Sequence, residues 1–249
     1  MALIEFDFLS LEALPAFGGA HWFGLTDARF CLRVGEQALF ERAPAGADGA
    51  AEVDRRIDHQ LARLHADLLG LLPDVLEPVP QSIASRIETL DAQLAWLHGI
   101  EARHATMPEE DDDAEDAWWL ATGWLQGARR LDTGWLRDMP AIWLLRIDDA
   151  VHLRWHANDA SEARRWSATS GEHVLPVDRF RDEVRDFHTR LMDGMAERID
   201  ALDRRAAIDR EAFERDQEQA RQLLGRAFEP HPDPTDWTAV DEAIRFLAD

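Results

Sequence analysis

The chain has 249 residues, 46% of them hydrophobic, so it can bury the core of one large domain or two small ones without disulfides or metals. Its 27 basic and 49 acidic residues give a formal charge of −22. A field of this sign repels nucleic acid and anionic membranes and attracts basic partners. The acidic charge therefore predicts that the protein binds neither nucleic acid nor membrane. The sequence has a single cysteine, no apolar run long enough for a membrane span and no signal-peptide pattern, and these features predict a cytoplasmic protein.

The N-terminal part of the chain has the patterns of strands. Residues 2–8 alternate, with Leu3, Glu5 and Asp7 on one side and the apolar Ile4, Phe6 and Phe8 on the other, which indicates a half-buried strand. Gly35 and Glu36 separate two short apolar runs, which predicts a hairpin. Cys31 lies in the first of these runs, so we expect a buried structural thiol rather than a reactive one.

A helical pattern then replaces the alternation. From residue 51 apolar side chains recur at intervals of three and four, which predicts a helix that Pro73 ends. A second helix is predicted over residues 82–104 by the same spacing. Two antiparallel helices of this kind would cover one face of a sheet.

Residues 117–157 are unusually rich in tryptophan. They hold six of the ten tryptophans of the chain, namely Trp118, Trp119, Trp124, Trp135, Trp143 and Trp155. The pattern predicts a helix, a tight loop at residues 132–134, and a hairpin of residues 142–147 with 151–157. Because tryptophan has the largest area to bury, we interpret this cluster as scaffold.

Alternation along the predicted hairpin assigns its side chains to two faces. The apolar face would hold Trp143, Leu145, Ile147, Val151, Leu153 and Trp155. The polar face would hold His152, Arg154 and His156.

The remainder of the chain is predicted to be mostly helical. One long helix should begin at Pro176 and run to about residue 205, and another should cover residues 209–228. Asp233 and Pro234 have the pattern of a helix start for the last segment. We therefore predict an α+β fold, in which an antiparallel sheet of N-terminal and central strands packs with long amphipathic helices.

A single domain over residues 1–249 is the favoured organisation, with residues 207–249 as a C-terminal helical extension.

The most acidic stretch of the chain is residues 107–116, where seven of the last eight side chains are carboxylates. Such a run repels itself and cannot pack apolar surface, so we expect an exposed loop. It is also the natural contact surface for a basic protein. The candidate partner-binding residues are Glu109, Glu110, Asp111, Asp112, Asp113, Glu115 and Asp116.

The sequence Asp132-Thr133-Gly134 has the pattern of an aspartic protease, but those enzymes need two such carboxylates that share a proton. We expect instead a loop in which Asp132 or Thr133 caps backbone amides and Gly134 has a positive φ. The histidine spacings match no metal motif and no nucleophile–base pair is evident, so neither a metal site, a cofactor nor a catalytic set is predicted.

A second reading keeps a small-ligand pocket or an enzyme open. In that reading the tryptophan-rich segment lines a pocket, and Asp132, Trp135, Arg154 and His156 are its polar and aromatic groups.

Several motifs together resemble an uncharacterised bacterial domain family of unknown function. They are HWFGLTD at residues 21–27, LLPDVLEPVP at 71–80, RRLDTGWL at 129–136 and IWLLRIDDAVHLRW at 142–155. Proteins of this kind resemble accessory or immunity-type proteins encoded near bacterial toxins. The resemblance and the charge together predict an acidic intracellular inhibitor, in particular an immunity protein that neutralises a toxin effector domain with a basic surface.

Overall fold

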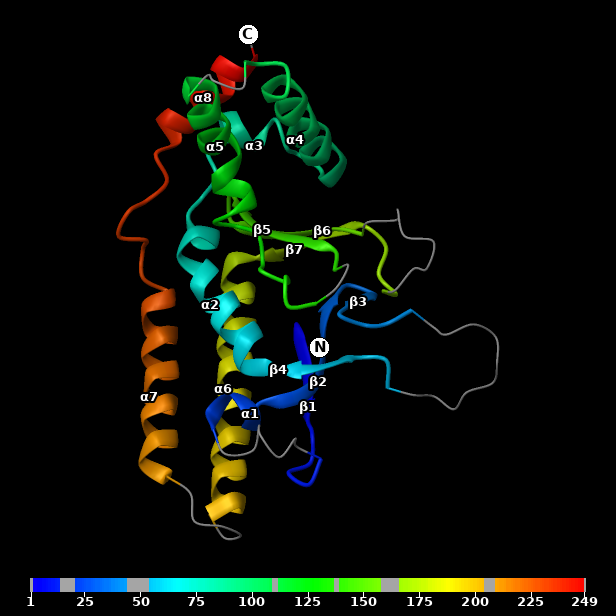
Figure 1. Ribbon diagram of the computed structural model, residues 1–249, viewed down its shortest axis with the longest axis vertical. Coiled ribbons are helices and arrows are strands. Elements are labelled where there is room, and N and C mark those ends of the chain that lie inside the picture. Colours follow the sequence, from blue (N-terminus) through cyan, green and yellow to red (C-terminus); the bar gives the residue numbers. More distant parts are fainter. Residues whose placement is uncertain are drawn as a thin grey trace.

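The computed structural model describes residues 2–13, 21–43, 54–108, 112–136, 139–157, 166–203 and 209–248 (Figure 1). The predicted α+β class is confirmed. The N-terminal and central strands form two separate antiparallel sheets, however, and not the one sheet that was expected.

The first sheet is built around its longest strand. Its strands are β1 (Ile4–Phe8), β2 (Asp27–Val34), β3 (Gln37–Leu39) and β4 (Ile57–Gln60). β1 pairs along one edge of β2, whereas β3 and β4 share the other edge. Gly35 has a φ of +63° in the predicted hairpin turn, a conformation that glycine adopts without strain. Cys31 is fully buried, as expected, and burial raises the pKa of its thiol to about 11.

The second sheet consists of β5 (Ala141–Ile147), β6 (Ala150–His156) and β7 (Gly171–Pro176). The predicted hairpin of β5 and β6 is confirmed, but the predicted assignment of its faces is wrong. The register sets Trp143 opposite Arg154 and Leu145 opposite His152, so these four side chains share a face.

The reason for the wrong assignment is that the second sheet is covered on both faces. One face carries Ile142, Leu144, Val151, Leu153 and Trp155, which belong to a core with residues of α2 and α6. The other face carries Trp143 and Leu145, which belong to a second core with residues of α4, α5 and α8. When both faces are apolar, alternation no longer identifies the buried side.

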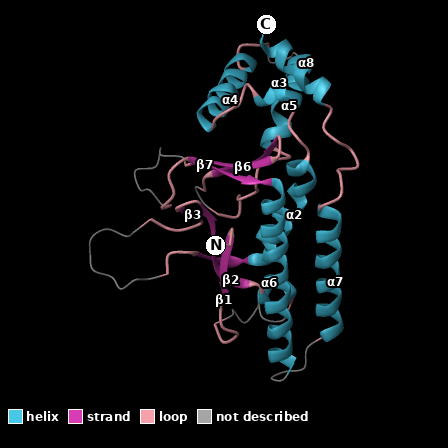
Figure 2. Cartoon of the chain, turned by 180° about the vertical axis from the view of Figure 1, so that it is seen from behind, coloured by secondary structure: helices cyan, strands magenta, loops and turns pink. Residues whose placement is uncertain are grey.

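Eight helices are described. They are α1 (Trp22–Leu25), α2 (Leu61–Leu76), α3 (Gln81–Ala84), α4 (Leu90–His104), α5 (Asp112–Gln126), α6 (Val177–Asp203), α7 (Arg210–Ala227) and α8 (Trp237–Ala248). Seen from behind, α2, α6 and α7 run beside the sheets, and α3, α4, α5 and α8 form a separate group at one end (Figure 2). Within the described part of the chain, no helix is both long and apolar enough to cross a membrane.

The helix boundaries differ from the predicted ones in three places. The first predicted helix begins ten residues late, because Ile57 belongs to β4, and Pro73 lies inside α2 instead of ending it. The second divides into α3 and α4, and Thr89 caps α4 by accepting a hydrogen bond from the amide of Ala92. At α8 the capping side chain is that of Asp236 and not of Asp233, since Asp236 accepts bonds from two amides of the first turn.

Two histidines meet inside the first core. Nε2 of His65 on α2 lies 2.9 Å from Nδ1 of His188 on α6, and both residues are buried. Burial, with a smaller effect of His188, lowers the pKa of His65 to about 3, and burial also lowers the pKa of His188. Two neutral imidazoles therefore share one hydrogen bond between the helices.

This pair makes the stability of the protein depend on pH. Since both folded-state pKa values lie below the ordinary value of 6.5, the unfolded chain binds more protons as the pH falls below 6.5. The contribution of the two neutral histidines to the free energy of unfolding is fully present above pH 6.5, and it is lost as the pH falls towards their folded-state pKa values. We expect the free energy of unfolding to fall by up to about 1.4 kcal/mol per pH unit for each histidine. Urea denaturation measures the free energy of unfolding at each pH, and the double variant His65→Leu, His188→Leu should lack this pH dependence. The control His98→Gln, at an exposed position, should keep it. Equal pH dependence in the wild type and both variants would contradict the assignment.

Candidate functional site

The acidic stretch begins a helix. Asp112 opens α5, so Asp112–Asp116 are the first helical residues and not part of the exposed loop that was predicted. Carboxylates stabilise the positive end of a helix dipole, and the buried Ala117 anchors this part of α5 in the second core. Glu109, Glu110 and Asp111, which were also predicted to bind a partner, lie outside the described residues.

The outer face of α5 combines charge with exposed aromatic and aliphatic surface. Asp112, Asp113 and Asp116 are exposed, and none of them makes an ion pair with a described residue. Trp119 and Leu120 follow on the same helix with 58% and 47% of their surface exposed. We call these five residues the α5 face. Large apolar side chains this exposed are typical of interaction surfaces when they lie together.

Trp119 is held in place although it is exposed. Its Nε1 donates a hydrogen bond to Glu115 Oε1 at 2.7 Å, and its ring packs edge to face on Trp118 with 4.6 Å between the ring centroids. Trp118 in turn stacks on His104 of α4, whose Nε2 lies 3.1 Å from Glu115 Oε2. The indole is therefore ordered before any partner arrives, which reduces the entropy lost on binding.

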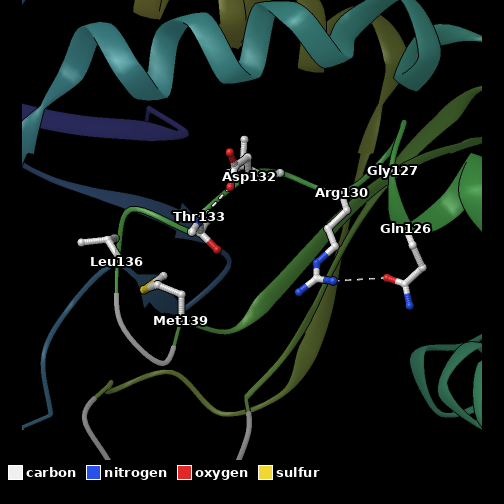
Figure 3. Close-up of a pocket in the computed structure, with 9 residues that line it drawn as sticks. Gln126, Gly127, Arg130, Asp132, Thr133, Leu136 and Met139 are labelled. Carbon is white, nitrogen blue, oxygen red and sulfur yellow. Dashed lines mark hydrogen bonds between the residues drawn. The ribbon is translucent and has the colours of Figure 1, made fainter.

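The loop at Asp132 borders a cavity of about 460 Å³ (Figure 3). Asp132 Oδ1 accepts a hydrogen bond from the amide of Gly134 at 2.8 Å, as the capping interpretation predicted. The predicted positive φ at Gly134 is wrong, because among the described glycines only Gly35 has one. The capping bond closes this turn together with the bond from the amide of Leu136 to the carbonyl of Thr133 at 2.8 Å.

The two sides of this cavity carry few groups that converge. Figure 3 shows Arg130 and Gln126 on one side and Asp132, Thr133, Leu136 and Met139 on the other. Arg130 Nη1 donates to Gln126 Oε1 at 3.5 Å, and its guanidinium lies over the ring of Trp143, 5.9 Å from the centroid. A single carboxylate engaged in a turn does not provide the shared proton of an aspartic protease.

Trp135 belongs to the wall behind the loop and does not line the cavity. Its ring stacks on Phe40 and lies 4.4 Å from the ring of His59, measured between centroids. Its Nε1 donates to Asp67 Oδ2 at 3.1 Å. The ring of Trp135 therefore packs the loop onto the first sheet, and its polar atom binds α2 at Asp67.

Arg154 is fully buried and all of its bonding groups have partners. Its Nη1 donates to the carbonyl of Ile87 at 2.6 Å and to Gln93 at 3.0 Å, and its Nη2 donates to the carbonyl of Glu88 at 2.9 Å. Its Nε donates to Glu172 Oε1 at 3.0 Å. This side chain ties β6 to the connection between α3 and α4, so its role is structural.

The four residues of the alternative pocket are thus not brought together. Asp132 borders a cavity, whereas Arg154 is fully buried and Trp135 is half-buried against Phe40 and His59. His156, the last residue of β6, pairs with Ser170 at 3.2 Å. Within the described ranges, no group of three or more His, Cys, Asp or Glu side chains could hold a metal ion.

With this geometry in place, the sequence was compared with known proteins. The profile of a family of unknown function, DUF5984, matches residues 3–243. The chain belongs to DUF5984. No curated protein and no solved structure matches it. The predicted resemblance to a family of unknown function is confirmed, and DUF5984 provides no activity to transfer to the residues described above.

Sequence reasoning missed Trp119 and Leu120, because every tryptophan of the segment was interpreted as core. The usable signal was the alanine spacing. Ala114, Ala117 and Ala121 share one side of a helix and are all buried, and Ala117 and Ala121 belong to the second core. Trp119 falls opposite that side, which a helical projection from residue 112 would have shown.

Arg154 provides the test of the structural interpretation. We expect Arg154→Ala to reduce the free energy of unfolding by about 3–5 kcal/mol, since it leaves the carbonyls of Ile87 and Glu88 without a donor and removes the buried ion pair with Glu172, which then keeps only His152. Chemical denaturation measures this loss. Arg130→Ala, at the exposed rim of the Asp132 cavity, serves as the control and should change stability by no more than about 0.5 kcal/mol. Equal effects of the two substitutions would contradict the assignment.

Proposed function

We propose that this DUF5984 protein binds a basic partner protein through the α5 face and inhibits it, as an immunity protein inhibits a toxin effector domain in the cytoplasm. The observation that carries the proposal is the ordered but exposed Trp119 beside three carboxylates that have no cationic partner among the described residues. Aromatic side chains of this kind contribute most of the binding energy in many interfaces.

The net negative charge of the chain also supports a basic partner. The formal charge of −22 steers basic proteins towards the molecule and accelerates encounter at low salt. On the α5 face this long-range attraction coincides with apolar surface. An arginine of the partner could place its guanidinium over the Trp119 ring while its charge pairs with Asp112 or Asp116.

Inhibition follows from the same chemistry. Enzymes that act on anionic substrates such as nucleic acids carry basic clefts. A surface with three carboxylates and an aromatic anchor neutralises such a cleft and occupies it at the same time. The contribution of Glu115 is indirect, because its carboxylate fixes Trp119 and His104.

The test compares two triple variants of equal charge change. One neutralises the α5 face with Asp112→Asn, Asp113→Asn and Asp116→Asn. The control neutralises exposed carboxylates elsewhere with Asp193→Asn, Glu197→Gln and Glu229→Gln. A basic protein of the native host that the wild type retains is purified, and binding and inhibition are then measured with the two pure proteins.

We expect the α5 variant to raise the Kd by about tenfold or more, equivalent to about 1.4 kcal/mol, and the control variant to change it much less. Trp119→Ala should cost about 2 kcal/mol or more of binding energy, and Phe246→Ala, which removes an exposed ring on α8, should cost little. Equal weakening by the two triple variants, or a bound partner that keeps its full activity, would overturn the proposal.

A further inference from the structure

A second cavity lies between α1, α2 and α7, and no residue of α5 lines it. Its volume is about 300 Å³, at the lower end of the range of roughly 300–1,000 Å³ for small-molecule pockets. We propose that it binds a planar aromatic cation of the amidinium or guanidinium class. The ring would lie against Trp22 and Phe23, and the charge would face Asp216. This site does not depend on the function proposed for α5.

The walls of the cavity suit a flat ring. Trp22 and Phe23 come from α1, and Leu223 comes from the facing side of α7. Trp22 packs on the first core and is fixed by it, whereas Phe23 keeps 43% of its surface exposed. Aromatic faces stack on planar groups and attract cations through their quadrupoles.

His65 provides a polar group at the inner end. The residue is 96% buried, yet it lines the cavity, and its Nε2 is used in the bond to His188. Its Nδ1 has no hydrogen-bond partner among the described residues. If His65 Nε2–H donates to His188, Nδ1 is the free acceptor of a residue that lines the cavity, and we propose that it receives a bond from an N–H of the ligand.

The charge at the cavity favours a cation. Burial keeps His65 neutral by lowering its pKa to about 3, so this imidazole does not repel a positive ligand. Asp216 of α7 lines the cavity and makes no ion pair with a described residue. Arg221, whose charge acts on His188, is itself paired with Glu218 at 3.7 Å. An anionic ligand would meet the carboxylate of Asp216, and no arginine is among the described residues that line the cavity.

The test uses four small probes with the full-length protein at constant ionic strength. Benzamidinium has both the ring and the cationic group. Benzamide keeps the ring without the charge, benzoate reverses the charge, and guanidinium keeps the charge without the ring. Titration calorimetry gives each Kd, and ¹⁵N spectra of the histidine rings report on Nδ1 of His65.

We expect benzamidinium to bind about tenfold or more tightly than any of the other three probes, because only it engages the rings and Asp216 together. Its binding should shift the His65 Nδ1 resonance. Asp216→Asn should remove most of the preference for benzamidinium over benzamide, and Asp193→Asn, an exposed carboxylate on α6, should leave it unchanged.

Ala66→Phe is the second variant, since Ala66 lines the cavity from an exposed position and a larger side chain there fills the space without disturbing the core. It should abolish binding while the thermal unfolding temperature stays the same. Equal affinity for benzamidinium and benzamide, tighter binding of benzoate, or binding that survives both Asp216→Asn and Ala66→Phe would overturn the proposal.

Discussion

The sheet of β5–β7 has apolar side chains on both faces, and this constraint determines how the rest of the chain packs. α2 and α6 contribute to the core on one face, and α4, α5 and α8 contribute to the core on the other. Arg154 crosses from the sheet to the connection between α3 and α4, and Glu172 balances its buried charge. A buried guanidinium without such a partner would be strongly destabilising, so this contact also fixes how the two layers align.

A comparable contact holds the last helix. Arg129 is buried, and its Nη2 donates to Glu77 Oε2 at 2.7 Å, while Glu77 also accepts bonds from Thr235 and Trp237 at the start of α8. The Arg129 guanidinium lies over the rings of Trp124 and Trp237, which pack edge to face on each other. The end of α2, the end of α5 and the start of α8 therefore meet at one ion pair, which holds α5 against the second core and presents its outer face to solvent.

The tryptophans of residues 117–157 differ in burial, and Trp119 is the most exposed of them. Trp124, Trp143 and Trp155 are almost fully buried, and they form the cores and their contacts. Trp119 is the exception in the same segment, exposed on α5 and ordered by Glu115 and Trp118. The scaffold interpretation of the tryptophan-rich segment is therefore incomplete, because the ring of Trp119 is exposed instead of buried in a core.

The sequence was sufficient to predict elements whose pattern has one buried side. The long α6 and the hairpin turn at Gly35 are of this kind. It was insufficient where local spacing and tertiary packing disagree. Ile57 fits a helical stripe but belongs to β4, where it pairs with Phe30. In β5 and β6 the alternation does not identify the buried face, because both faces of the sheet are covered. The acidic residues of the proposed site were chosen from charge and remain a prediction, whereas the choice of Trp119 required knowledge of which side of α5 is buried.

The central claim is that Trp119 on the acidic α5 face is the point of contact for basic protein. It is tested most directly by recording the indole N–H signals of the ¹⁵N-labelled protein during titration with a nona-arginine peptide, with Trp119→Phe used to assign the signal. The account predicts that the Trp119 signal shifts furthest, that the signals of the buried Trp143 and Trp155 stay in place, and that the shift weakens as salt is added. A largest shift at another tryptophan, or no shift at Trp119 at low salt, would contradict it.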